Sequence, residues 1–173
     1  MKKEKKAWRE GFSLVEMIIV IAIIGILVGA VGLSVLMLRS ADTKGAAYDI
    51  NGRLTELKSR TTGGKEQPYL YLYRLNQEYY LDFSYTKPDD YSPTTDAKEI
   101  GDSGMKITYG SAKNALEDAP NGFLCLAFQK KDGAFLVSGK CQCPELITVE
   151  ADGASTYEVH MIEDTGHHYI EEK

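Results

Sequence analysis

Beyond the first ten positions of this 173-residue chain, whose formal net charge is −5, basic residues are too few to balance the acidic ones. Those ten positions hold five bases and two acids, a local charge of +3, which leaves −8 for the remainder. Nucleic-acid affinity comes mostly from Lys and Arg side chains that neutralise phosphates, so direct nucleic-acid binding is disfavoured. The chain also lacks a G-x-S-x-G nucleophile motif. We expect no catalytic residues and no enzymatic activity.

Charged residues are missing altogether from Met17 to Leu38, a run of 22 residues. As a helix this run is about 33 Å long, and the hydrocarbon core of a bilayer is about 30 Å thick. Bases precede the run, which predicts a single membrane pass with a cytoplasmic N-terminus and an exported C-terminal part. The run is longer than the apolar region of a secretory signal and has no small-x-small cleavage site at its end. We therefore do not expect removal of the whole run.

The residues just before this run form a second signal. Gly11 is followed by Phe12-Ser13-Leu14-Val15-Glu16, and the apolar run begins directly after Glu16. A basic leader, this sequence and an apolar helix together resemble the prepilin signal of type IV pilins and pseudopilins. The resemblance implies that residues 1–11 are a cytoplasmic leader, that prepilin peptidase cuts between Gly11 and Phe12, and that Phe12 is then N-methylated. A plain membrane anchor requires neither Gly11-Phe12 nor Glu16.

Glu16 needs a partner, because a carboxylate in or near a bilayer is costly. Cleavage would create an amine on Phe12, four residues away and therefore on the same helix face. The carboxylate can neutralise this amine or that of a neighbouring subunit. The resemblance implies the neighbour, and with it a role for Glu16 in filament assembly. The alternative is an interfacial Glu whose side chain simply reaches water.

Three glycines, Gly25, Gly29 and Gly32, interrupt the apolar run. Gly25-x-x-x-Gly29 is a small-x-x-x-small pattern that lets helices approach closely. We expect close helix packing in a filament core, and the ordinary glycine content of membrane helices is the alternative. Many motility-type pilins carry a proline in this half of the helix, whereas this chain has none before Pro68. That absence favours a pseudopilin-like or divergent minor subunit.

The helix is expected to continue beyond the apolar run. One apolar stripe recurs there at helical spacing, formed by Ala47, Ile50, Leu54 and Leu57. Gly63-Gly64 is a stop signal. We expect a membrane and filament-core half at residues 12–38, an amphipathic half at 39–62, and a β-rich extracytoplasmic domain at 63–173.

The remainder has the pattern of β-strands. Aromatic-rich runs at 69–75 and 78–85 predict a hairpin with its turn at Asn76-Gln77, and the Tyr69, Tyr71 and Tyr73 stripe is expected to pack the sheet rather than bind a ligand. A polar loop is expected from Lys87 to about Gly104, and a short helical turn from Lys113 to Asp118. Further strands are predicted in MKITYG, GFLCLAFQK, GAFLVSGK, ELITVEA and STYEVHMI. The predicted fold class is α+β, a pilin-like long N-terminal helix packed on an antiparallel β-sheet.

The three cysteines are an odd number, so any disulfide leaves one thiol over. Asp132-Gly133 is a strong hairpin turn, and folding about it brings Cys125 close to Cys141, with Cys143 the less favoured partner. Reduced, buried cysteines are the alternative. Cysteine and histidine are zinc ligands, but the spacing of Cys141-x-Cys143 and the three histidines matches no known closed site. We expect no metal and no cofactor.

These patterns indicate a filament subunit, either a pilin or a minor pseudopilin. The resemblance implies as partners other pilin subunits, prepilin peptidase, membrane lipid before assembly, and a membrane assembly platform with its ATPase. It implies that the chain lies first in the inner or cytoplasmic membrane and later in an extracellular or cell-envelope filament. The competing class is a single-pass, membrane-anchored extracytoplasmic binding domain or enzyme that never polymerises. The sequence does not choose between a type IV pilus, type II secretion and competence.

Overall fold

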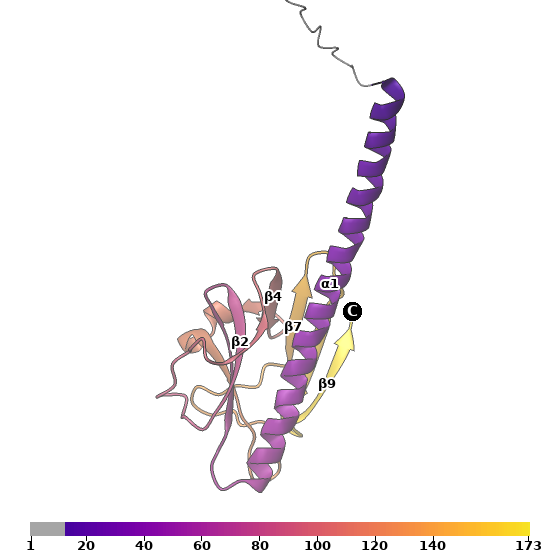
Figure 1. Ribbon diagram of the computed structural model, residues 1–173. Coiled ribbons are helices and arrows are strands. Elements are labelled where there is room, and N and C mark those ends of the chain that lie inside the picture. Colours follow the sequence, from indigo (N-terminus) through magenta and orange to yellow (C-terminus); the bar gives the residue numbers. More distant parts are fainter. Residues whose placement is uncertain (1–12) are drawn as a thin grey trace, which may run out of the picture. The chain divides into compact units, whose positions relative to one another are not determined.

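The computed structural model describes residues 13–173, without the side-chain surroundings of residues 30–36 and 120 (Figure 1). Its first element is α1 (Leu14–Gly63), a single helix of 50 residues. The helix ends within two residues of the expected boundary, and Gly64 follows its last residue. The chain divides between Leu36 and Met37 into two units, which are described separately.

In the first unit, every described side chain from residue 13 to residue 29 is exposed. Most of these side chains are large and apolar. Among the helices that the structure describes, none combines the length and the apolar character that a membrane crossing requires. The expected membrane-spanning role of residues 12–38 is therefore not confirmed.

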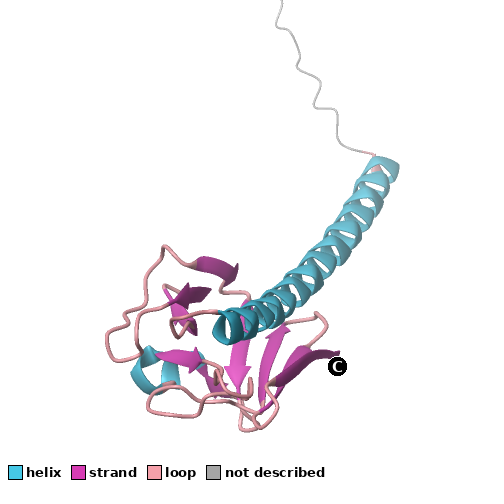
Figure 2. Cartoon of the chain, turned by 90° about the horizontal axis from the view of Figure 1, so that it is seen from below, coloured by secondary structure: helices cyan, strands magenta, loops and turns pink. Residues whose placement is uncertain are grey.

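The second unit, residues 37–173, contains two antiparallel sheets where one was expected (Figure 2). The four-stranded sheet has the order β3-β2-β1-β6, with β3 (Lys98–Gly101), β2 (Glu78–Ser84), β1 (Tyr69–Leu75) and β6 (Phe123–Leu126). The five-stranded sheet has the order β5-β4-β7-β8-β9, with β5 (Asn114–Ala115), β4 (Met105–Tyr109), β7 (Leu146–Ala151), β8 (Tyr157–Ile162) and β9 (His167–Glu172). Two short 3-10 helices, η1 (Leu116–Asp118) and η2 (Pro120–Gly122), precede β6.

The core lies between the C-terminal half of α1 and both sheets. All residues of the predicted apolar stripe are fully buried, as is Ala46 beside them. They share one cluster with side chains of both sheets, among them Leu70, Leu72, Ile107, Val149 and Val159. Full burial of an aliphatic side chain contributes about 1.5–3 kcal/mol, so the stripe fixes this half of the helix to the sheets. The predicted α+β class, a long helix packed on antiparallel sheet, is confirmed.

The predicted hairpin is confirmed. β1 and β2 pair over their whole length, ending at Leu75 opposite Glu78. The two turn residues both have positive φ, 52° at Asn76 and 70° at Gln77. Two successive positive φ values are typical of the type I′ turn, whose twist matches that of the strands.

Two other predictions about strands and loops are wrong, and a third is confirmed only in part. The expected polar loop from Lys87 to about Gly104 contains β3, which pairs with the free edge of β2 and buries Ile100. The run GAFLVSGK forms no strand, because its only ladder contact with the preceding run is an isolated bridge between Phe128 and Phe135. The helical turn expected from Lys113 to Asp118 is confirmed at its end, where η1 is a 3-10 helix, whereas Asn114 and Ala115 form β5 instead. β3 and β5 each form through pairing with another strand, β2 and β4 respectively.

Strand β9 was not expected. Its sequence, HHYIEE, has no alternating apolar pattern, but it pairs with β8 along its whole length. The turn before it depends on Gly166, where φ is +61° and a Cβ would lie 1.9 Å from the carbonyl oxygen of Gly133. Only glycine tolerates both conditions. His168 then ties β9 to α1, because its Nε2 lies 3.0 Å from the Thr55 hydroxyl.

Candidate functional site: the N-terminal signal and assembly region

The first turn of α1 is capped by Ser13. The Ser13 Oγ accepts a hydrogen bond from the backbone N–H of Glu16 at 3.1 Å, and the Ser13 carbonyl accepts one from the N–H of Met17 at 3.2 Å. Ser13-x-x-Glu16 is the spacing of a capping box, which places the carboxylate near the positive end of the helix. The motif was readable from the sequence but was overlooked there. Gly11 and Phe12 lie outside the described residues.

The apolar surface that follows Glu16 surrounds the helix. Its exposed side chains are Met17, Ile18, Ile19, Val20, Ile21, Ile23, Ile24, Ile26, Leu27 and Val28. Soluble monomers rarely expose an apolar surface of this extent, and such surfaces mark protein or membrane contacts. The first stretch of α1 therefore offers a binding surface rather than a core.

Two of the three glycines lie open on this surface. A Cβ built at Gly25 or at Gly29 meets no atom within 4 Å. The chain's own packing therefore does not require glycine at these positions. Gly32 belongs to the segment whose side-chain surroundings are not described. An outside helix could approach the backbone closely at Gly25 and Gly29.

The tyrosine stripe of β1 is used for packing. Tyr71 and Tyr73 are fully buried, and Tyr91 from the loop after β2 stacks on Tyr71 with ring centroids 3.6 Å apart. The Tyr71 and Tyr73 hydroxyls donate to the carbonyls of Thr86 and Thr94, at 2.5 and 2.7 Å. The loop thus covers the stripe and leaves these two rings no free face for a ligand.

Tyr91 anchors that loop. Its hydroxyl donates to the Asp82 carboxylate at 2.8 Å. Burial, followed by hydrogen bonding with Tyr73 and Asp82, raises the pKa of Tyr91 well above its usual range. The phenol therefore stays protonated at physiological pH and acts as a structural donor.

Two of the cysteines form a disulfide. Cys125 in β6 is bonded to Cys141, with their Cα atoms 4.6 Å apart. The turn at Asp132-Gly133 reverses the chain between them, and φ at Gly133 is +73°. Cys143 is a free, half-buried thiol. Burial and the nearby Glu163 raise the pKa of Cys143 to about 12, which makes it a poor nucleophile and a poor metal ligand.

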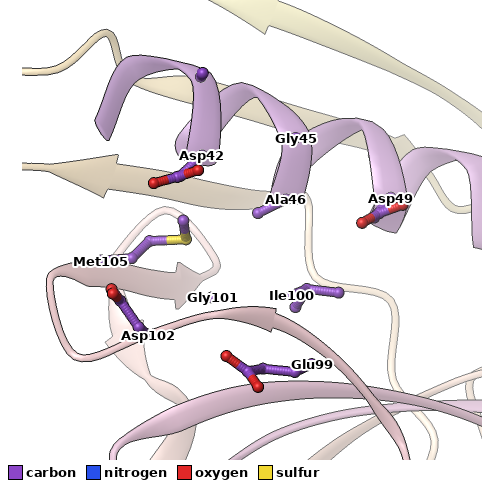
Figure 3. A pocket seen from close by; sticks show the side chains of 10 residues that line it. Asp42, Gly45, Ala46, Asp49, Glu99, Ile100, Gly101, Asp102 and Met105 are labelled. Carbon is purple, nitrogen blue, oxygen red and sulfur yellow. The ribbon is translucent and has the colours of Figure 1, made fainter. Parts of the chain in front are cut away.

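A groove in the second unit lies between α1 and the β3–β4 segment (Figure 3). Its lining is acidic, with Asp42 and Asp49 from the helix facing Glu99 and Asp102. Lys98 pairs with Asp49 at 2.6 Å. Small residues of α1, Gly45 and Ala46, leave the space open. The lining residues do not include a nucleophile beside an oriented base, so this groove offers no catalytic arrangement.

One cluster of potential metal ligands was missed in the sequence. Among the described residues, Glu158, His160 and Glu171 bring three ligand atoms within 4.8 Å of one another. The alternation Glu158-x-His160 was visible in the sequence, but the third residue comes from the unexpected strand β9. None of the cysteines belongs to this cluster.

Comparison with known proteins agrees with the features of the N-terminal region. Residues 9–32 match the prokaryotic N-terminal methylation motif. No curated protein and no solved structure matches the chain. The matched segment contains Gly11, Phe12, Glu16 and the three glycines of the apolar run. Residues 9–32 therefore carry a type IV prepilin-like signal, and the chain joins this signal to a long helix packed on antiparallel sheets.

Proposed function

We propose that this chain is a structural subunit of a type IV pilus-like filament, either a pilin or a minor pseudopilin. The observation that carries the proposal is the N-terminal methylation motif at residues 9–32, which includes a helical stretch whose apolar side chains are exposed on all sides. The motif indicates prepilin-type processing. The exposed stretch supplies a surface that other copies of the helix can cover.

Processing is proposed to remove residues 1–11. The peptidase cuts between Gly11 and Phe12 and leaves a methylated amine on Phe12. Residues 12–38 then form the filament-core half of the helix, residues 39–62 the amphipathic half, and residues 63–173 the outward-facing domain. The capped start of α1 supports this division, because the Ser13 hydroxyl, just after the proposed cut, already accepts a hydrogen bond from the backbone N–H of Glu16.

Glu16 is proposed to direct assembly. It is the only charged residue between Phe12 and Leu38, and its side chain is exposed. Pairing with the Phe12 amine of a neighbouring subunit would neutralise both charges and fix the axial register of the two helices. Gly25, Gly29 and Gly32 are proposed as positions of closest helix approach.

Before assembly, residues 12–38 are proposed to lie in the inner or cytoplasmic membrane, with the N-terminus in the cytoplasm. The uncharged run of 22 residues in the sequence supports this proposal. Lipid shields apolar side chains from water no less than another helix does. The hydrophobic effect therefore does not drive extraction of the helix from the membrane. A membrane platform with an ATPase is the proposed source of the free energy.

The test combines processing with assembly in cells that contain the peptidase. Mass spectrometry of the native N-terminal peptide should show a chain that begins at methylated Phe12. Glu16→Ala and Glu16→Gln should both be cleaved, yet they should be depleted from the sheared filament fraction. Removing one partner of a poorly solvated ion pair commonly costs about 3–5 kcal/mol, and the membrane boundary should reduce this.

Two outcomes would overturn the proposal. An intact leader on the wild-type chain in those cells would exclude prepilin processing. If the wild-type chain is cleaved but is neither recovered in a filament fraction nor crosslinked to other subunits, a membrane-anchored domain that never polymerises is favoured. Wild-type assembly by both Glu16 variants would remove Glu16 from the mechanism.

A further inference from the structure

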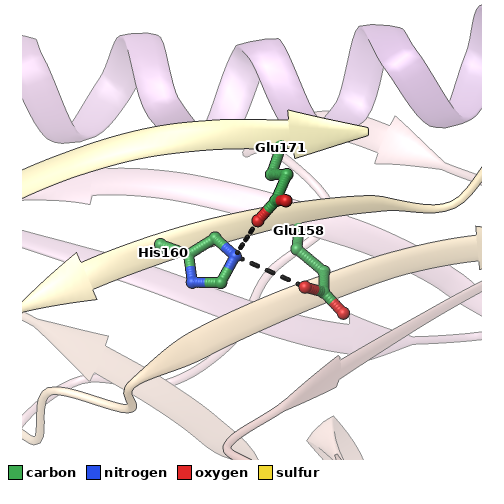
Figure 4. A group of neighbouring side chains, drawn as sticks. All are labelled: Glu158, His160 and Glu171. Atoms are coloured by element: carbon green, nitrogen blue, oxygen red, sulfur yellow. Dashed lines mark ion pairs between the residues drawn. The ribbon is translucent and has the colours of Figure 1, made fainter. Parts of the chain in front are cut away.

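Three polar side chains meet on the face of the five-stranded sheet that points away from the core. Glu158 and His160 alternate along β8, and Glu171 lies directly opposite Glu158 on β9. The intervening residues, Val159 and Met161, are buried on the other face. The three side chains therefore converge because of the register of two paired strands (Figure 4).

The imidazole of His160 lies between the two carboxylates. Its Nε2 is 3.3 Å from Oε2 of Glu158 and 3.2 Å from Oε2 of Glu171. These distances are short enough for ion pairs, yet Nε2 is buried and makes no hydrogen bond to either oxygen. The N–H or lone pair on this nitrogen therefore points at neither carboxylate oxygen. A buried ring nitrogen without a partner is costly.

The ring of His160 is also held in place. Tyr169, opposite His160 on β9, stacks on the imidazole with centroids 4.9 Å apart and planes at 10°. Stacking fixes the plane of the ring, and the plane sets the direction of the Nε2 lone pair. The nitrogen is thus oriented by a neighbour rather than by a hydrogen bond.

A bound cation would satisfy all three ligand atoms at once. Zinc binds histidine nitrogen and carboxylate oxygen at about 2.0–2.2 Å in tetrahedral sites, which puts neighbouring ligand atoms about 3.3–3.5 Å apart. The two nitrogen–oxygen distances of 3.3 and 3.2 Å are close to that tetrahedral edge. We propose that Glu158, His160 and Glu171 bind one divalent cation of the zinc type, with a fourth position open to water.

Lys173 is the competitor for this site. Its Nζ lies 3.3 Å from Oε2 of Glu158 and 3.8 Å from Oε2 of Glu171. The ammonium partly neutralises the two carboxylates when no metal is bound. Its side chain is half exposed and can move into solvent. Zinc binding exchanges this ammonium for a divalent ion.

The site joins β8 to β9, and β9 is an edge strand. A bound metal would therefore crosslink β9 to β8 and so stabilise the edge of the sheet. This role is independent of the proposed filament function, because all three ligands lie in the second unit, far along the chain from residues 9–32.

The test uses the full-length chain, purified in detergent and stripped of metal. Zinc is added in competition with a chromophoric chelator, and amide hydrogen exchange of β9 is followed in parallel. One zinc ion should bind per chain, and the amides of β9 should exchange more slowly with zinc. His160→Phe keeps a ring beside Tyr169 but removes the nitrogen, and it should weaken binding by at least about tenfold, as should Glu171→Gln.

Three control variants sharpen the result. His167→Asn removes an exposed histidine of the same strand and should bind zinc like the wild type. Cys143→Ser removes the free thiol and should also bind like the wild type. Lys173→Gln should strengthen binding severalfold, because a competing cation is lost. The proposal is overturned if the wild type binds zinc no better than both His160→Phe and Glu171→Gln, or if Cys143→Ser abolishes binding.

Discussion

Two stretches of α1 contain similar apolar side chains in opposite surroundings. Leu54 and Leu57 are fully buried against the two sheets, whereas Leu27 is 59% exposed. Residues 46–57 are apolar on one stripe only, and the chain itself covers that stripe. Residues 14–29 are apolar on all sides, and within the described residues their side chains stay exposed. Residues 46–57 therefore stabilise the domain, whereas residues 14–29 are available for contacts with other molecules.

The largest expected effect comes from a matched pair of leucine truncations. Leu54→Ala should lower the free energy of unfolding of the domain by about 2–5 kcal/mol, because it leaves a cavity in the core. Leu27→Ala should change it by less than about 0.5 kcal/mol, yet it should reduce incorporation into filaments. Urea unfolding of the full chain in detergent, followed by the near-ultraviolet signal of the tyrosines, measures the first quantity. Equal losses of stability in the two variants would break the comparison.

The second-largest effect is expected from removal of the disulfide. Cys125 and Cys141 are 16 residues apart, and a crosslink of this loop length stabilises the folded state by about 3 kcal/mol. The double variant Cys125→Ala, Cys141→Ala should lose about 2–4 kcal/mol of stability. Cys143→Ser is the matched control and should lose little, because its sulfur forms no disulfide. Filament incorporation by any double variant that remains folded should be unchanged, since the bridge lies outside residues 14–29.

A smaller effect is expected at Tyr91. Tyr91→Phe removes the hydrogen bond to Asp82 and should cost about 1–3 kcal/mol. Tyr48→Phe is the control, since Tyr48 lies exposed on α1 and should cost less than about 0.5 kcal/mol. Both stabilities come from urea unfolding at pH 7. Equal costs would show that the Tyr91 hydroxyl contributes nothing to the loop.

The pH dependence of the Tyr91 effect has a defined sign. The folded-state pKa of Tyr91 is raised by burial and hydrogen bonds, so the unfolded chain releases this proton first as pH rises. The stabilising contribution is therefore complete below the ordinary tyrosine pKa of about 10 and is lost above it. Between about pH 9 and 11 the stability of the wild type should fall more steeply than that of Tyr91→Phe.

The smallest expected effect compares two acidic residues of the helix. Glu56 pairs with Arg53 at 2.7 Å and with Arg60 at 2.6 Å, and hydrogen bonding to Arg53 leads the causes that lower its pKa. Glu56 is partly exposed, so Glu56→Gln should cost only about 0.2–1 kcal/mol. That contribution should disappear as pH falls below about 4.5. Filament incorporation should be unchanged, in contrast to Glu16→Gln. A defect in incorporation would show that the covered half also takes part in assembly.

Local patterns were enough to predict α1, its buried stripe and the β1–β2 hairpin. Helical spacing of Ile50, Leu54 and Leu57 and the turn at Asn76-Gln77 depend only on neighbours in sequence. β3 and β9 could not be predicted in this way. Ile100 is the only buried residue of β3, and β9 is held by its pairing with β8 and by the close approach at Gly166. Such pairings depend on the whole fold.

The candidate sites divide in the same way, into one that a local sequence pattern specifies and one that depends on strand pairing. Gly11, Phe12 and Glu16 form a contiguous motif and were readable directly. The cluster of Glu158, His160 and Glu171 requires the register of β8 against β9, which no local pattern specifies. The Ser13 cap is also a local pattern, in the same stretch as the proposed assembly residue Glu16. Glu16 can take part in both, because the Ser13 cap accepts a hydrogen bond from the backbone N–H of Glu16 and leaves the carboxylate free to pair.

The position of β9 at the outer edge of its sheet bears on how copies of this chain avoid aggregation. An edge strand presents unpaired backbone groups to which a strand of another molecule can add. Four of the six residues of β9 are histidine or glutamate, and charged edges resist such addition. The charged edge therefore opposes the joining of sheets from neighbouring copies into cross-β aggregates. In the proposed filament, association is left to the apolar helix, and the proposed removal of residues 1–11 can control the addition of each molecule.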